Sequence, residues 1–187
     1  MRCLLCSKLS LRFICRECEE AIAVYPRVYS LRDLNAIGFY DYDDIAPLTN
    51  AKYYPFGAFI LKRLALKAFK PFFCDLELKD RAALIPIDDR VGAWYSHTAV
   101  LAKFGASGAV TPRFGRLRAR SQEKYAGRTL AFRQSRPRRF IFKDFAEQNA
   151  ILLDDLITTG TTLLEARETL EKNGKTVLFA IALTRAL

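Results

Sequence analysis

Two apolar segments with an amphipathic segment between them give the clearest structural pattern in this sequence. Ala150–Leu153 is wholly apolar, and Thr176–Leu183 is apolar at almost every position. Uninterrupted apolar runs are typical of strands in a sheet that is covered on both faces. The intervening Thr161–Lys172 has a helical pattern and is followed by Asn173-Gly174, a common helix stop. A strand, a helix and a second strand predict a βαβ unit, and therefore an α/β fold with a parallel sheet flanked by helices.

The upstream pattern predicts further elements of both kinds. These are a strand at Ala36–Asp43, an amphipathic helix at Phe56–Lys70, a strand at Ala82–Ile87 and a helix at Trp94–Phe104. Pro71 is expected to end the first of these helices, because proline cannot continue the hydrogen-bond ladder. Arg63, Lys67 and Lys70 share one face of that helix. We expect this face to be solvated, with a partner surface as the alternative. No internal repeat is visible.

The composition is that of an ordinary globular protein. The 187 residues are 51% hydrophobic and 27% charged, a balance that argues against disorder and suits one domain with its own core. The longest apolar run, Tyr53–Leu61, has nine residues, whereas a transmembrane helix needs roughly 18. The opening MRCLLC does not resemble a secretory signal. We therefore expect a cytoplasmic protein whose thiols stay reduced.

Four cysteines near the start of the sequence form two CxxC pairs. Cys3 and Cys6 are separated by eight residues from Cys15 and Cys18. Four thiolates at this spacing can surround one tetrahedral Zn²⁺, and such a closed site leaves no position for a substrate. The sequence therefore predicts a small structural zinc ribbon, with a redox-active dithiol pair as the alternative. Cys74, in an aromatic run, is expected to be a small buried apolar residue.

The net charge is concentrated in one segment. The formal net charge is +10. Residues 113–143, here called the basic segment, hold eleven bases and a single acid, Glu123, so they account for the whole excess of positive charge. Its bases are Arg113, Arg116, Arg118, Arg120, Lys124, Arg128, Arg133, Arg136, Arg138, Arg139 and Lys143. Arginine forks bind phosphate, and the interleaved aromatic rings can stack on unpaired bases. We interpret the segment as a single-stranded nucleic-acid surface. The alternatives are a solvated loop, a loop that closes over a small polyphosphate, and a contact with an anionic membrane.

A threonine-rich loop follows the apolar strand at 150–153. Asp154 and Asp155 end that strand, and the loop into the next helix carries Thr158, Thr159, Gly160, Thr161 and Thr162. A helix N-terminus attracts phosphate through its N–H groups and dipole, and glycine lets the backbone approach a ligand. The paired acids suit a neighbouring diol or a Mg²⁺ ion. Neither GxxxxGK[ST] nor GxGxxG is present, so neither a nucleotide P-loop nor a dinucleotide fold is indicated.

The run from Asp154 to Thr162 closely resembles the phosphoribosyl-pyrophosphate (PRPP) motif of type I phosphoribosyltransferases. By that resemblance, Asp154 and Asp155 would hold the ribose hydroxyls of PRPP, bound with Mg²⁺, and residues 158–162 would hold its 5-phosphate. Purine-salvage members usually carry an aspartate at the position of Thr158, so purine salvage is disfavoured.

The four-cysteine segment ahead of this motif makes the chain similar to the ComF family, a phosphoribosyltransferase-like group linked to natural competence. Phe39–Tyr42, Leu48–Tyr53 and Pro86 also agree with that family, so the resemblance covers nearly the full chain. It implies a zinc-binding segment at residues 1–25 and a type I phosphoribosyltransferase-like domain at residues 26–187.

Together with the phosphate loop and the basic segment, the resemblance implies a PRPP-binding protein that binds single-stranded DNA and assists DNA uptake in natural transformation. Its expected place is the cytoplasm, beside the uptake machinery at the inner face of the membrane. The alternative is an active phosphoribosyltransferase that releases pyrophosphate from PRPP onto a non-purine acceptor. A third possibility is a zinc-organised interaction module without a ligand. No catalytic residue is assigned. His97, the only histidine, is expected to be a packed or polar helix residue rather than an acid or base.

Overall fold

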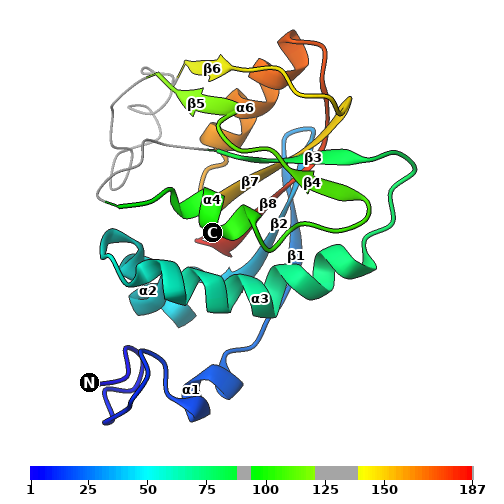
Figure 1. Cartoon of the computed structure of the whole chain (residues 1–187). Helices are drawn as coiled ribbons and strands as arrows, with labels where there is room; N and C mark the ends of the chain where they lie inside the picture. Colours follow the sequence, from blue (N-terminus) through cyan, green and yellow to red (C-terminus); the bar gives the residue numbers. More distant parts are fainter. Residues whose placement is uncertain (88–93, 121–138, 187) are drawn as a thin grey trace.

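The computed structural model describes residues 1–87, 94–120 and 139–186. A six-stranded sheet in the order β1-β2-β8-β7-β3-β4 lies at its centre, and β5 and β6 form a separate two-stranded sheet (Figure 1). β1 and β2 are antiparallel, and every other neighbouring pair in the large sheet is parallel. The predicted α/β class with a mostly parallel sheet is therefore confirmed. The strands are β1 (Arg27–Leu31), β2 (Leu34–Asp41), β3 (Ala82–Pro86), β4 (Val110–Pro112), β5 (Leu117–Ala119), β6 (Phe140–Phe142), β7 (Asn149–Ile157) and β8 (Thr176–Arg185).

Helices cover both faces of the large sheet. They are α1 (Arg16–Ala21), α2 (Tyr42–Asn50), the 3-10 turn η1 (Ala51–Tyr53), α3 (Gly57–Asp75), α4 (His97–Ala102) and α6 (Thr161–Lys172). One core layer joins α2, α3 and α4 to the sheet, and the other joins α6 and the β5–β6 hairpin to the opposite face. Neighbours on β7 show the division, because Leu152 belongs to the α6 layer and Leu153 to the α3 layer. Both are fully buried, which explains the apolar run at this strand.

The predicted elements differ from the observed ones mainly at their ends. α6 has the predicted bounds, Thr161–Lys172. β7 continues to Ile157, so the two acids lie within the strand rather than after it. The strand predicted at residues 36–43 ends at Asp41, because the following residues begin α2. The helix predicted at residues 94–104 is limited to His97–Ala102.

Pro71 does not end α3, and that prediction is wrong. The helix continues through Pro71 to Asp75. Phe72 and Phe73 follow the proline, and their rings contact those of Phe39 and Phe69 at edge-to-face distances of 5.2 and 6.3 Å. This packing holds the last turn in place despite the hydrogen bond that proline cannot make.

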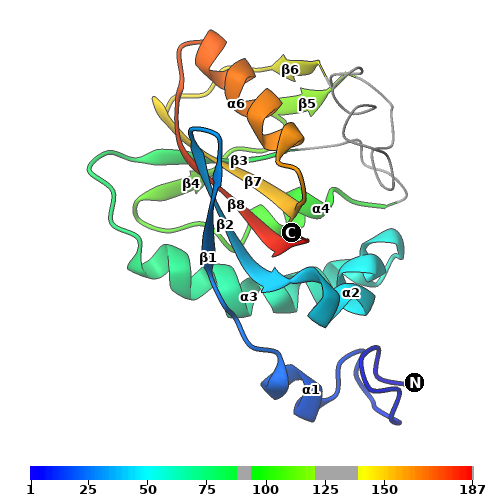
Figure 2. The same cartoon turned by 180° about the vertical axis from the view of Figure 1, so that it is seen from behind.

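The cysteine-bearing segment lies on the outer side of α2 and α3, away from the sheet, as the view from behind also shows (Figure 2). Ile14 and Ile22 of this segment are buried in the same core layer as Leu61 of α3. Among the described residues, none of the helices combines the length and apolar character needed to cross a membrane.

Candidate functional site

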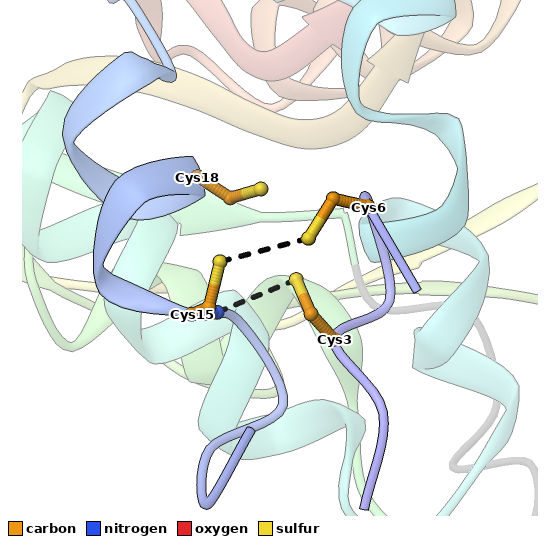
Figure 3. Close-up of side chains that lie close together, drawn as sticks. All are labelled: Cys3, Cys6, Cys15 and Cys18. Carbon is orange, nitrogen blue, oxygen red and sulfur yellow. Dashed lines mark hydrogen bonds between the residues drawn. The ribbon is translucent and has the colours of Figure 1, made fainter. Parts of the chain in front are cut away.

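The four cysteines of the two CxxC pairs converge on one point (Figure 3). Their Sγ atoms all lie within 4.8 Å of one another, and those of Cys6 and Cys15 are 3.7 Å apart. Zinc–sulfur bonds of about 2.3 Å in a tetrahedron imply sulfur–sulfur separations of about 3.8 Å. The cluster can therefore hold a metal ion such as zinc, with Cys3, Cys6, Cys15 and Cys18 as its ligands.

Local backbone geometry forms this cluster. Ser7 adopts a left-handed conformation, with φ at 60°, and this turn brings Lys8 back so that its carbonyl accepts the N–H of Cys3. The second pair opens α1, with Cys15 at the N-cap and Cys18 in the first turn. The turn at Ser7 and the start of α1 therefore position the two cysteine pairs.

The thiols differ in how readily they ionise. Burial opposes ionisation of Cys3, but hydrogen bonds from backbone N–H groups, that of Cys15 first, lower its pKa to about 6. Hydrogen bonds with the other cysteines, Cys15 foremost, and partial burial raise the pKa of Cys18 to about 12. Four adjacent thiolates need a cation between them, so metal binding would be accompanied by proton release.

Charged side chains of α3 contact the cysteine-bearing segment, residues 1–25. Arg63 pairs with Glu19 at 2.7 Å, and the Lys67 ammonium donates to the backbone carbonyls of Glu19 and Ile22. Arg63, Lys67 and Lys70 are all exposed, as expected for a solvated face, but Arg63 and Lys67 also contact the cysteine-bearing segment. The sequence could not show this, because the partners lie more than 40 positions away.

A topological switch point lies at the carboxyl edge of the large sheet. β3 and β7 are neighbours, with Pro86 opposite Leu153. From β3 the chain leads through α4 to the outer strand β4, whereas from β7 it leads through α6 to β8, on the other side. α4 and α6 cover opposite faces of the sheet. Ligands of open α/β sheets bind at such a point.

The loop between β7 and α6 occupies this point. Its Gly160 is the N-cap of α6 and has a left-handed backbone, with φ at 71°. A Cβ atom there would lie 2.6 Å from Cδ1 of Leu31, so both the turn and the close approach require glycine. Glycine has no side chain to cap α6, and the hydroxyls of Thr159 and Thr161 lie 2.9 Å apart at the same end. This helix N-terminus is suited to an anion.

The two acids of β7 have different partners. Successive strand residues point to opposite faces, so Asp154 and Asp155 diverge. The Asp154 carboxylate accepts the backbone N–H of Asp155 at 2.8 Å. Asp155 pairs instead with Lys52 of η1, whose ammonium donates to Oδ2 at 2.5 Å. The carboxylates therefore flank the end of β7 from two sides.

Mutual charge stabilises the pair of Lys52 and Asp155 in its ionised form. Burial disfavours both charges, but the Asp155 carboxylate raises the pKa of Lys52 above its ordinary value. Burial alone would raise the pKa of Asp155, but the positive charge and the hydrogen bond of Lys52 outweigh it, and His97 adds a smaller effect. The pKa of Asp155 is therefore lowered.

His97 lies beside this pair at the first position of α4. Its ring meets those of Tyr95 and Tyr53 edge to face, with centroids 5.3 and 6.2 Å apart. The preceding Ser96 caps the helix by accepting the N–H of Ala99. The geometry agrees with a packed helix residue, but one that lies at the edge of the candidate site.

The basic segment is described only in part. Arg113 is engaged in a bidentate pair with Glu147, and Arg116 donates to the backbone carbonyl of Asp144. Arg118 within β5, Arg120 just after β5 and Arg139 just before β6 are exposed. The remaining predicted DNA contacts, Lys124, Arg133, Arg136 and Arg138, lie outside the described residues.

Two comparisons give matches and one does not. No protein-family model matches the chain. The chain is 35% identical over 91 residues to the proteins named "Putative ribose-phosphate pyrophosphokinase 2" in Streptococcus pyogenes serotypes M3 and M6. The match covers 43% of this chain and only 28% of the length of those relatives. Orotate phosphoribosyltransferase from Aeropyrum pernix aligns in structure with a TM-score of 0.41 and 18% identity, over 89% of this chain and 77% of that chain.

Reasoning from sequence missed Lys52 as a site residue and misjudged Cys74. Lys52 is 103 positions from Asp155, and only its place in the run Leu48–Tyr53 drew attention to it. Cys74 is exposed, which corrects the expectation that it is buried. It lies in the last turn of α3, where Phe73 rather than Cys74 faces the core.

Proposed function

We propose that the carboxyl edge of the sheet binds PRPP, or a closely related phosphorylated ribose, together with Mg²⁺. The observation that carries this proposal is the N-terminus of α6, which has no side-chain cap and begins one short loop after the strand that carries the acid pair, at the switch point of the sheet. The sequence similarity to proteins named ribose-phosphate pyrophosphokinase supports the same ligand class.

Each group at this edge has a chemical role in the proposal. The first turn of α6 and the hydroxyls of Thr158, Thr159, Thr161 and Thr162 hold the 5-phosphate, with Gly160 allowing close approach. Asp154 and Asp155 accept hydrogen bonds from the ribose hydroxyls or contact Mg²⁺, a hard cation that prefers carboxylate oxygen. The four-cysteine cluster binds zinc as a structural element.

Calorimetric titration with PRPP and Mg²⁺ tests this function. We expect one binding site in the native chain and at least a tenfold loss of affinity in Asp154→Asn, about the effect of removing a charged hydrogen-bond partner. Glu168→Gln, at an exposed position of α6, serves as the control and should bind as the native chain does. Equal affinity in Asp154→Asn and the native chain would contradict the assignment.

A second function, contact with single-stranded DNA, is favoured by the basic segment. Eleven bases and one acid lie in residues 113–143. Three exposed arginines, Arg118, Arg120 and Arg139, lie within or next to the paired strands β5 and β6. Together with the resemblance to the ComF family, this supports a role in DNA uptake during natural transformation, at the cytoplasmic side of the uptake machinery.

The salt dependence of oligonucleotide binding tests the second function. In a plot of log K against log salt concentration, each phosphate contact with single-stranded DNA makes the slope more negative by about 0.7. We expect the triple variant Arg118→Gln/Arg120→Gln/Arg139→Gln to weaken binding and flatten this slope. The matched control removes three exposed lysines elsewhere, Lys62, Lys70 and Lys79. If both triple variants have the same effect, net charge rather than this surface is responsible.

Catalysis is the alternative to ligand binding alone. An active phosphoribosyltransferase would release pyrophosphate from PRPP as an acceptor attacks the ribose. Release that Asp154→Ala/Asp155→Ala abolishes would establish an enzyme, and retained PRPP binding without release would favour a ligand-binding role in DNA handling.

A further inference from the structure

The ion pair between Lys52 and Asp155 is an enclosed charged contact at the carboxyl edge of the sheet. The two side chains are only 16% and 19% exposed. Tyr42, Thr49, Leu61 and Thr184 line a small cavity together with the two residues of the pair. Enclosed ion pairs add little net stability, because the loss of hydration offsets the attraction between the charges. A contribution to folding stability therefore does not by itself explain why these two charged residues are paired here.

The backbone on both sides of the pair is fixed in place. The hydroxyl of Tyr95 donates to the carbonyl of Lys52 at 3.1 Å, which holds the η1 turn. The hydroxyl of Thr184 donates to the carbonyl of Asp155 at 2.9 Å, which holds β7. The long lysine side chain is then the part that can change partner while the turn and the strand stay in position.

Lys52 and the phosphate loop approach β7 from opposite faces of the sheet. Ala51, next to Lys52, is buried in the core layer of α2 and α3, whereas Leu163 in the first turn of α6 is buried in the opposite layer. A ligand lying across the end of β7 would therefore meet an anion-binding helix N-terminus on one side and a lysine ammonium on the other. Such a pair of groups suits a ligand with anionic groups at two separate positions.

We propose that Lys52 binds the second anionic group of the ligand, the pyrophosphate of PRPP, and that Asp155 is its counter-ion in the free protein. The inference rests on the proposed function and deepens it. When the ligand binds, phosphate oxygens replace the carboxylate at Nζ, and Asp155 becomes available to a ribose hydroxyl or to Mg²⁺. Lys52 thus has an anionic partner both before and after the exchange, and no proton is transferred. Lys52 thereby distinguishes PRPP from a ribose that carries only the 5-phosphate.

Affinities for PRPP and ribose 5-phosphate, each measured with Mg²⁺ in the native chain and in Lys52→Met, test the proposal. We expect Lys52→Met to lose about tenfold or more in affinity for PRPP and less than about threefold for ribose 5-phosphate. Lys52→Arg keeps the charge and should retain most of the preference for PRPP. Lys62→Met removes an exposed lysine of α3 and is the matched control. If Lys52→Met does not fold, Lys52→Gln, which can still donate to Asp155, replaces it.

The outcomes separate this inference from the function on which it rests. If the native chain binds neither ligand, the proposed function fails, and this inference fails with it. If the native chain binds both and the Lys52 variant keeps the native preference for PRPP, only this inference fails. An equal loss for both ligands would also overturn it, because it would give Lys52 a structural role rather than contact with pyrophosphate.

Discussion

The ring of Phe13, in the spacer between the two cysteine pairs, stacks on the ring of Phe56 just before α3. Their centroids are 4.6 Å apart and their planes are inclined by 9°. The ring of Tyr54 continues the stack on Phe56 at 5.4 Å. Tyr54 directly follows the η1 turn that carries Lys52. A continuous row of aromatic rings therefore joins the cysteine segment to the turn at the candidate ligand site.

Removing Phe13 tests the strength of this attachment. Phe13→Ala is expected to lower the free energy of unfolding by about 1–2 kcal/mol, through lost stacking and lost apolar burial. Urea denaturation measures the change. Phe114→Ala, at an exposed phenylalanine before β5, is the control. Equal unfolding midpoints for the two variants would mean that the Phe13 stack contributes nothing to stability.

The cysteine cluster predicts a specific metal content. Purified native chain should contain one zinc ion, and Cys3→Ser and Cys18→Ser should each lose or weaken it and unfold at a lower temperature, because metal binding contributes to folding. Cys74→Ser changes an exposed cysteine outside the cluster and should keep full zinc. Elemental analysis gives the stoichiometry. Full loading of both cluster variants would rule out a four-thiolate site.

Two glycines with similar backbones separate conformational strain from steric contact. Gly160 has φ at 71° and would place a Cβ 2.6 Å from Leu31, whereas Gly174 has φ at 78° with nothing within 4 Å of its Cβ position. Gly174→Ala should cost about 1 kcal/mol, the usual penalty of a left-handed alanine. Gly160→Ala should cost clearly more, and Leu31→Ala in the same chain should recover part of the difference. Equal losses in the two alanine variants would exclude the contact with Leu31.

The pair of Arg113 and Glu147 predicts a pH dependence of stability. The hydrogen bond from Arg113 lowers the pKa of Glu147 below its ordinary value of 4.5, against the effect of burial. A carboxylate whose pKa is lowered by folding stabilises the protein above its unfolded pKa, and this contribution is lost as the pH falls through the folded value. Glu147→Gln should therefore differ most from the native chain near neutral pH and approach it in acid.

Urea midpoints measured at about pH 6.5 and about pH 3.5 follow this convergence. Glu77→Gln, at an exposed position after α3, is the control and should follow the native chain at both values. A constant gap between Glu147→Gln and the native chain would contradict the role of this ion pair.

Periodicity predicted the elements whose faces are uniformly apolar or strictly amphipathic. α6 is the clearest case, since its bounds are set by a threonine-rich start and by Asn173-Gly174. β8 extends two residues past its predicted end, because Thr184 and Arg185 are polar yet buried. Arg185 lies 2.6 Å from the Asp41 carboxylate of β2, a partner that no local pattern could reveal.

The candidate site was predictable where it is continuous in sequence and not where it is assembled in space. The two CxxC pairs and the loop from Asp154 to Thr162 are local patterns. The structure brings the four cysteines to one point, and it begins α6 at Thr161 with Gly160 as its N-cap. Lys52 lies in a distant turn, and the contacts of Arg63 and Lys67 with Glu19 join residues more than 40 positions apart. Such contacts depend on how the layers pack, which the order of polar and apolar residues does not specify.

The most direct test of the central claim is a crystal structure of the chain with PRPP and Mg²⁺. Our account predicts the 5-phosphate at the first turn of α6, within hydrogen-bond distance of backbone N–H groups between Thr159 and Thr162, and the ribose beside Asp154. PRPP bound elsewhere at saturating concentration, for example on Arg118 and Arg139, or an empty carboxyl edge, would contradict it.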